Sequence, residues 1–327
     1  MRVSASIGVA TTEDSVDATE LLSHADLALY SAKSAGKRQW CHYQPSLQAG
    51  LVARHELNEN LDTAIAESAF RLYYQPIVDL ASGALVAFEA LVRWPHDRRG
   101  MVLPDEFIAL AEESGQIVPL GAWVLERAAQ EAAGWHAFSS AARAAVGLPP
   151  LRVNVNVSAR QFRDAGFVDV VRGAVRTSGI PAESLVLELT ESVLMRRDDR
   201  VHTDMHTLGE LGVGIAIDDF GTGYSSLSYL REFPISILKI DKSFIDGLGL
   251  SQQQYALVEG ITRIADTLGV QVIAEGIEHP DQRDLLAAMG CPLGQGYLFA
   301  HPLTPDQART FIEQHTTPLG EHTGPGS

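Results

Sequence analysis

Strand-like and helix-like segments alternate along residues 57–315, and this alternation limits the possible folds more than any other feature of the chain. Apolar runs predict eight strands, at residues 72–78, 84–92, 151–157, 185–189, 213–217, 236–240, 270–274 and 296–299. Segments with helical periodicity separate most of them, at residues 105–114, 120–137, 167–178, 255–268 and 281–289. The pattern predicts an α/β protein with a TIM-like (β/α)8 barrel, and a doubly wound open sheet is the alternative.

Polar side chains stand late in most of these predicted strands or next to them. They are Glu89, Asn156, Glu188, Asp218, Asp219, Lys239, Glu275 and Gln295. The carboxyl ends of barrel strands converge on one face, whereas an open sheet concentrates its site at one switch point. Polar residues at so many strand ends therefore favour the barrel, and they predict one shared cavity.

The acidic residues of this set require a cation. Five carboxylates cannot share a small cavity in ionised form unless positive charge compensates them. Oxygen ligands without histidine or cysteine favour Mg²⁺ or Mn²⁺ over zinc, and Asp218 is suited to bridging two ions. Asn156 adds a neutral oxygen. Lys239 is a cation suited to orienting or activating water, or to meeting the charge of a phosphate.

Short motifs surround these residues in a fixed order along the chain. They are Tyr74-Gln75-Pro76-Ile77, Glu89-Ala90-Leu91-Val92-Arg93, Asn156-Val157-Ser158, Glu188-Leu189-Thr190-Glu191-Ser192, the loop at residues 218–226, Lys239-Ile240-Asp241, Ala274-Glu275-Gly276-Ile277-Glu278 and Gln295-Gly296-Tyr297-Leu298-Phe299. Together they resemble the EAL-domain family of cyclic di-GMP phosphodiesterases over nearly all of residues 57–315.

This resemblance implies a metal-dependent hydrolysis of one phosphodiester bond of cyclic di-GMP, which gives linear pGpG. It implies six metal ligands, namely Glu89, Asn156, Glu188, Asp218, Asp219 and Glu275. Lys239 and Glu275 are expected to act in catalysis, and Glu191 to hold the loop that carries the aspartate pair. The resemblance also implies a barrel with one antiparallel strand, and a homodimer whose interface is coupled to that loop.

Three further residues match family positions that meet the substrate. Arg93 and Gln75 match residues that contact the dinucleotide, Arg93 through a phosphate, and Gln295 matches a glutamine that lines the site. Two other functions stay open at this point. One is a receptor that binds cyclic di-GMP without hydrolysing it, and the other is a metal-dependent nuclease of general specificity.

The first 43 residues have a different character. A strand at residues 3–10, a helix at 15–35 and a short strand at 40–43 are too little to bury a core alone. The motifs Val3-Ser4-Ala5-Ser6-Ile7-Gly8-Val9-Ala10, Ala25-Asp26-Leu27-Ala28-Leu29-Tyr30-Ser31-Ala32-Lys33 and Gly36-Lys37-Arg38 resemble the end of a GGDEF (diguanylate cyclase) domain. The loop that names that family is absent, so no cyclase activity is expected. Residues 44–56 are expected to be a polar linker before a helix at 55–67, and residues 316–327 a disordered tail.

The composition of the chain limits its possible binding partners and its compartment. A formal net charge of −16 opposes nonspecific binding to DNA, RNA or anionic lipid. Two cysteines are too few for a disulfide framework, so a reducing cytoplasm is expected. No apolar run approaches the roughly 20 residues that span a bilayer, so no membrane contact is expected from this segment. A membrane anchor elsewhere in a longer parent protein stays open.

Overall fold

The computed structural model describes residues 4–34, 38–194, 199–221 and 229–316. The chain divides into two compact units, Met1–Glu67 and Ser68–Ser327. Most of the predicted aspartate loop, at residues 222–226, and nearly all of the predicted tail, at residues 317–327, lie outside the described residues. Among the described helices, none has both the length and the apolar composition needed to cross a membrane.

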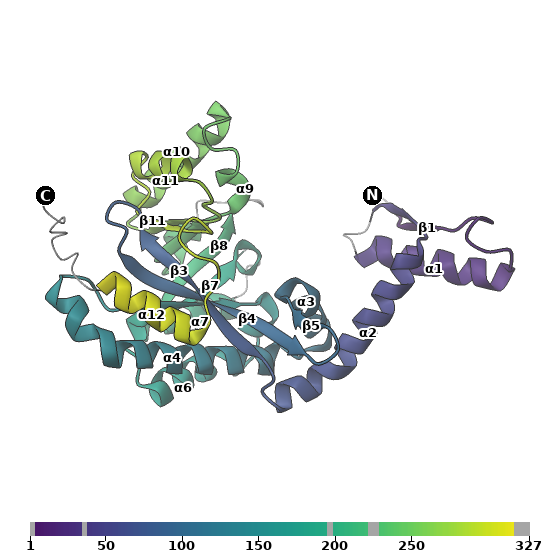
Figure 1. The fold of residues 1–327 in the computed structure, drawn as a ribbon, viewed down its shortest axis with the longest axis horizontal. Helices are drawn as coiled ribbons and strands as arrows, with labels where there is room; N and C mark the ends of the chain where they lie inside the picture. The colour runs from purple at the N-terminus through teal and green to yellow at the C-terminus, as the bar shows by residue number, and fades with distance from the viewer. Residues whose placement is uncertain (1–3, 35–37, 195–198, 222–228, 317–327) are drawn as a thin grey trace, which may run out of the picture. The chain divides into compact units, whose positions relative to one another are not determined.

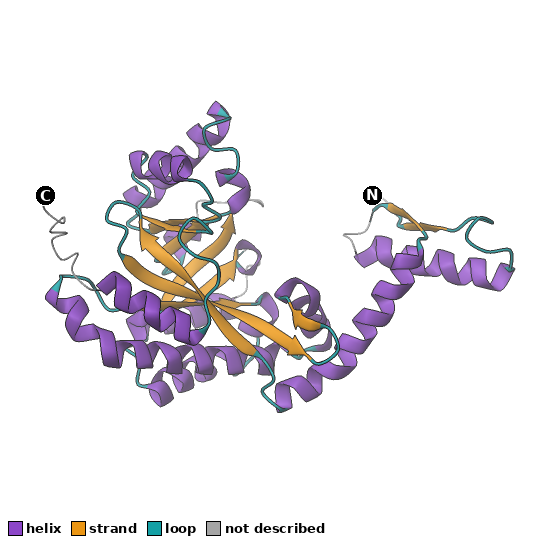
Figure 2. Ribbon diagram, in the orientation of Figure 1, coloured by secondary structure: helices purple, strands orange, loops and turns teal. Residues whose placement is uncertain are grey.

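The larger unit is a closed barrel, as the alternation of segments predicts (Figures 1 and 2). Its ring follows the order β3-β11-β10-β9-β8-β7-β6-β4 and closes through a β3–β4 pairing. Strand β3 is antiparallel to both of its neighbours, β4 and β11, whereas the remaining pairs in the ring are parallel. The strands are β3 Arg71–Asp79, β4 Leu85–His96, β6 Arg152–Val157, β7 Leu185–Thr190, β8 Gly214–Phe220, β9 Ile237–Ile240, β10 Gln271–Ala274 and β11 Leu293–Gln295, and β5 Gly100–Val102 extends β4 outside the ring.

Helices surround the barrel, with α6 and α12 both lying against α4 (Figure 1). The helix predicted at residues 167–178 forms with those bounds, because Phe167, Val171 and Ala174 share one buried face and Gly179 ends it in the left-handed conformation. The helices are α3 Pro104–Ser114, α4 Ile117–Ala145, α5 Ala159–Phe162, α6 Phe167–Ser178, α7 Asp199–Glu210, α8 Tyr229–Glu232, α9 Lys242–Ile245, α10 Gln252–Thr267, α11 Pro280–Ala288 and α12 Pro305–Thr316, with 3-10 turns η1 Ala182–Ser184 and η2 Glu191–Val193.

An apolar layer fills the barrel interior. Seven strands each contribute one buried side chain to it, namely Ile77, Ala87, Val186, Ala216, Ile237, Ile273 and Leu293. Strand β6 instead places Asn154 in register with Val186 of this layer. The polar residues predicted at the strand ends therefore stand above a packed core, as in other barrels of this type.

The eighth strand was predicted in the wrong place. We expected it at residues 296–299, but the ladder is formed by β11, Leu293–Gln295. A side chain on Gly296 would collide with the Ile277 carbonyl oxygen, since a Cβ there would lie 2.1 Å from it. The chain leaves the sheet where Gly296 approaches Ile277 so closely. The apolar residues that follow belong to a turn in which the Leu298 N–H donates to the Ile277 carbonyl oxygen.

The smaller unit contains a two-stranded parallel sheet, β1 Ile7–Val9 and β2 Trp40–His42, with helix α1 Ala18–Ser34 against it. These elements agree in type with the expected ones. Helix α2, Pro45–Ala66, covers the stretch where a polar linker was expected. Pro45 explains the earlier start. Its fixed φ suits the first helical turn, and the N–H that proline lacks would have no intrahelical partner at that position.

Candidate metal centre

The barrel brings the predicted polar residues together around one buried lysine. Lys239, on β9, is only 1% exposed, and its ammonium lies among four carboxylates. The distances from Nζ are 2.6 Å to Glu188, 2.6 Å to Glu275, 3.2 Å to Asp218 and 3.6 Å to Glu89. These acids come from four different strands or strand ends, so only the closed barrel can assemble the group.

The charges in this group are unbalanced. Burial acts to lower the pKa of Lys239, but Glu188, Glu275 and the other nearby carboxylates together raise it well above its usual value. Burial raises the pKa of Glu188 well above normal, and burial followed by the charge of Asp218 raises that of Glu275 to about 8. One ammonium thus faces several acids, and the excess negative charge favours further cations.

Asp218 and Asp219 reach the same cavity because strand β8 is irregular at this point. Ile217 pairs with Leu238, and the next pair is Phe220 with Ile240, so β8 uses three residues where β9 uses two. Asp219 adopts a left-handed conformation with φ of 53°, which is uncommon for a residue other than glycine. Consecutive side chains of a regular strand point to opposite faces, and this bulge brings both carboxylates to the same side.

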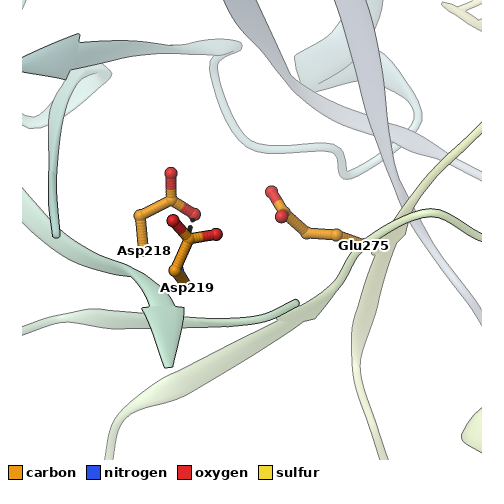
Figure 3. A group of neighbouring side chains, drawn as sticks. All are labelled: Asp218, Asp219 and Glu275. Atoms are coloured by element: carbon orange, nitrogen blue, oxygen red, sulfur yellow. Dashed lines mark hydrogen bonds between the residues drawn. The ribbon is translucent and has the colours of Figure 1, made fainter. Parts of the chain in front are cut away.

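Three carboxylates converge in an arrangement that suits a hard cation. Figure 3 shows Glu275 pointing across the site toward Asp218 and Asp219, which lie side by side. One oxygen of each residue lies within 4.8 Å of the others. Burial, followed by the charge of Asp218, raises the pKa of Asp219. Oxygen ligands of this kind match the preference of Mg²⁺ or Mn²⁺.

Amide side chains hold the carboxylate of Glu89. Asn156 Nδ2 donates to Oε1 at 2.6 Å, and Gln295 Nε2 donates to Oε2 at 2.6 Å. The same Gln295 nitrogen lies 3.0 Å from Gln75 Oε1, so Gln75 belongs to this network. Gln75 and Gln295 were predicted to meet the substrate, and in this structure both are buried and support Glu89.

Two predicted residues lie farther out. Arg93 follows Glu89 by four residues on the same face of β4, is partly exposed, and donates to the Val92 carbonyl oxygen. Its guanidinium lies 5.9 Å from the centre of the Tyr73 ring. Glu191 is buried at the start of turn η2. Most of the loop that it was predicted to hold, at residues 222–226, lies outside the described residues.

Two cavities meet at Asp218. One, of about 300 Å³, contains Glu89, Lys239 and Glu275. The other, of about 590 Å³, has apolar walls that include Leu91, Ile108, Leu120 and Val124. A flat apolar ligand group can thus lie directly beside the acidic cluster.

Sequence reasoning did not single out Asn154 or Lys242. Asn154 Nδ2 donates to Glu188 Oε1 at 2.8 Å, and Lys242 lines the smaller cavity and pairs with Glu278 at 2.8 Å. A signal for Asn154 was present, because it stands two residues before Asn156 and so faces the same side of the strand. Lys242 follows Lys239 by three residues and starts helix α9.

Comparison with known proteins indicates the family of this chain. Residues 58–302 match the sequence profile described as the EAL domain. The chain is 38% identical over 308 residues to the bifunctional diguanylate cyclase/cyclic di-GMP phosphodiesterase MucR of Pseudomonas aeruginosa, covering 94% of this chain and 44% of MucR. It is 40% identical over 314 residues to the cyclic di-GMP phosphodiesterase NbdA of the same organism, covering 96% of this chain and 39% of NbdA.

A solved structure supports the same relationship. The structure described as the PaMucR phosphodiesterase in a c-di-GMP complex superposes with a TM-score of 0.71 at 39% identity, covering 77% of this chain and 99% of that one. The chain spans less than half the length of the two curated relatives above. Since the family profile covers most of residues 57–315, where the barrel and its acidic centre lie, the chain belongs to the EAL domain family.

Proposed function

We propose that this chain hydrolyses one phosphodiester bond of cyclic di-GMP to linear pGpG, using Mg²⁺ or Mn²⁺. The observation that carries the proposal is the buried Lys239 amid four carboxylates, beside the converging oxygens of Asp218, Asp219 and Glu275. MucR and NbdA are named as cyclic di-GMP phosphodiesterases, which supports the choice of substrate.

The residues that would hold two ions are the six predicted ones. They are Glu89, Asn156, Glu188, Asp218, Asp219 and Glu275. Bound cations would supply a more acidic water and offset the charge on the phosphate oxygens. The chain itself supplies the geometry, since Glu89 is held through both oxygens by amide donors and the β8 bulge aims two acids at one place.

The role proposed for Lys239 is that of a hydrogen-bond donor rather than a general base. Its ammonium donates toward Glu188 and Glu275, each at 2.6 Å, so it carries its protons where the acids converge. There it can orient the attacking water and offset the charge that develops on the phosphate. Glu275 shares the catalytic role in this proposal, because it contacts Lys239 and also belongs to the converging carboxylates.

Substrate contacts are proposed for the rim of the site. Arg93 would bind a phosphate oxygen of the dinucleotide, and Gln75 and Gln295 would line its path near Glu89. The cavity of about 590 Å³ offers apolar walls for a flat base beside Asp218. Glu191 would hold the loop at residues 222–226, through which a homodimer would regulate the site.

One experiment separates the candidate functions. Purified protein is incubated with cyclic di-GMP and Mg²⁺ or Mn²⁺, and the products are resolved by chromatography, with a chelator control. We expect pGpG only when a cation is present. Tight binding without product would favour the receptor function instead, and comparable hydrolysis of unrelated DNA or RNA would favour a general nuclease.

We also propose that residues 1–43 are the end of a GGDEF domain without cyclase activity. The alignment with MucR, named as bifunctional, extends over 94% of this chain and so includes most of the smaller unit. For a parent protein of this kind, the proposed location of the barrel is the cytoplasm. Cyclase assays of this chain with GTP should give no cyclic di-GMP.

A further inference from the structure

Strand β6 directs two asparagines into the barrel, and only one of them belongs to the proposed ligand set. Asn154 and Asn156 are two residues apart, so their side chains lie on the same face of the strand. The register places Asn154 opposite Glu89 on β4 and Val186 on β7, whereas Asn156 stands opposite Glu188. Asn154 is therefore one step deeper in the barrel than Asn156.

The hydrogen bonds of the two asparagines cross this register. Asn156 donates to Glu89 at 2.6 Å, and Asn154 donates to Glu188 at 2.8 Å. Each amide thus reaches the acid that is not directly opposite to it. The inclined, staggered strands of a closed barrel bring diagonal neighbours of this kind together.

Asn154 is an unusual residue for its surroundings. It is fully buried and stands in register with Val186 of the apolar layer. A buried amide in an apolar environment costs stability unless it forms hydrogen bonds, and a hydrogen bond to a charged group is worth more than a neutral one. The contact with Glu188 gives this amide a function that an apolar side chain could not perform.

Glu188 is consequently held at both oxygens. Asn154 Nδ2 contacts Oε1 at 2.8 Å, and Lys239 Nζ contacts Oε2 at 2.6 Å. Rotation of the carboxylate about its terminal bond would break both contacts, so its plane is fixed. An ionised carboxylate has about four acceptor positions. The positions that Asn154 and Lys239 do not occupy can accept a cation on the side where Glu188 lines the larger cavity.

We propose that Asn154 is a positioning residue, which orients the Glu188 carboxylate so that it can bind a cation. This inference rests on the proposed function of the metal centre. Glu89 is supported in the same manner, with one amide donor on each oxygen. Both buried acids therefore have two donors each, and for Glu188 the donor from the core side is Asn154.

The test compares variants of the whole chain in which the donor is removed. Asn154→Leu keeps the approximate size of the side chain and removes the donor, and Asn154→Ser keeps polarity but is too short to reach Glu188. Mn²⁺ binding is measured from the electron paramagnetic resonance signal of free Mn²⁺. We expect the Kd for Mn²⁺ to rise by about 10–100-fold in both variants, as changes to residues supporting metal ligands do. The KM for cyclic di-GMP at saturating Mn²⁺ should stay near the wild-type value.

Thr262→Val is the matched control, since Thr262 is also a buried polar residue of the larger unit, and its hydroxyl donates to the Val258 carbonyl oxygen, outside the acidic cluster. It should leave the Kd for Mn²⁺ unchanged. A folded Asn154→Leu or Asn154→Ser variant with wild-type Mn²⁺ affinity would overturn the proposal. If the wild type bound Mn²⁺ without hydrolysing cyclic di-GMP and the variants bound it more weakly, the proposed function would fail and the role of Asn154 would stand.

Discussion

The acidic centre has an inner half, Glu89 and Glu188, and an outer half, Asp218, Asp219 and Glu275, and the protein holds the two halves differently. The inner acids are buried, and donors from Asn154, Asn156, Gln295 and Lys239 occupy both oxygens of each. Of the outer acids, Asp218 and Glu275 are partly exposed and Asp219 is exposed, and one oxygen of each lies within 4.8 Å of the others.

This difference indicates which half depends on a cation for its shape. Fixed amide donors set the orientation of the inner acids before any ion binds. The outer acids instead repel one another at short range, and Lys239 offsets only part of their charge. Loss of a donor that holds an inner acid should therefore lower cation affinity gradually, whereas loss of an outer acid should remove turnover altogether.

The largest effect is expected for Asp218→Asn, which keeps the shape of the outer half and removes one charge. Changes to residues that support a metal ligand lower metal affinity or activity by up to roughly 100-fold. Turnover of cyclic di-GMP should fall by more than this, because a proposed metal ligand is itself lost. In chelator the melting temperature should rise, since one source of repulsion is gone. The exposed Asp284→Asn serves as the control and should change neither quantity. Turnover within tenfold of wild type would remove Asp218 from the ligand set.

Lys239→Met tests the cation that the two halves share. Breaking a buried ion pair by removing one partner typically costs about 3–5 kcal/mol, and we expect a loss of this order in the free energy of unfolding, measured with urea in chelator. Added Mn²⁺ should restore part of it. The matched control is Lys242→Met, whose ion pairs are exposed and worth only about 0–1 kcal/mol. Equal losses in the two variants would show that the cluster does not depend on Lys239.

Gln295→Leu weakens the inner half alone, by removing the donor on Glu89 Oε2. Affinity for Mn²⁺ should fall by about tenfold, the lower end of the range for such supporting contacts. The control is Gln282→Leu, which removes a buried amide bonded to the Ile245 carbonyl oxygen, outside the cluster. The control should lower the melting temperature without changing the affinity. The distinction between the halves would fail if Gln295→Leu abolished turnover as completely as Asp218→Asn.

The smallest effect concerns pH. The pKa of Glu275 is raised from 4.5 to about 8 by burial first and then by neighbouring carboxylates, so between these values the folded protein holds a proton that the unfolded chain has released. Stability in chelator should therefore decrease as the pH rises through this window. Glu275→Gln should make the decrease of the unfolding free energy with pH shallower, and so should added Mn²⁺. An unchanged slope in urea titrations of Glu275→Gln would contradict this assignment.

Much of the barrel could be predicted from local pattern. Seven of the eight predicted strands overlap observed ring strands, and helix α6 has the expected bounds. Such segments are predictable because apolar periodicity is a property of neighbouring residues. The eighth strand was misplaced because its position depends on the contact between Gly296 and Ile277, residues that belong to different loops. The start of α2 was missed because a polar stretch led by a proline resembled a linker.

By itself, the sequence determined the alternation of strands and helices and the acids at the strand ends, since both follow from residues close together in the chain. Only the tertiary structure decided how those acids are held. The crossed bonds of Asn154 and Asn156 depend on the stagger between β6 and its two neighbours, and the aim of Asp218 and Asp219 depends on a bulge against β9. Register between strands distant in sequence is set by closure of the barrel, which no local pattern encodes.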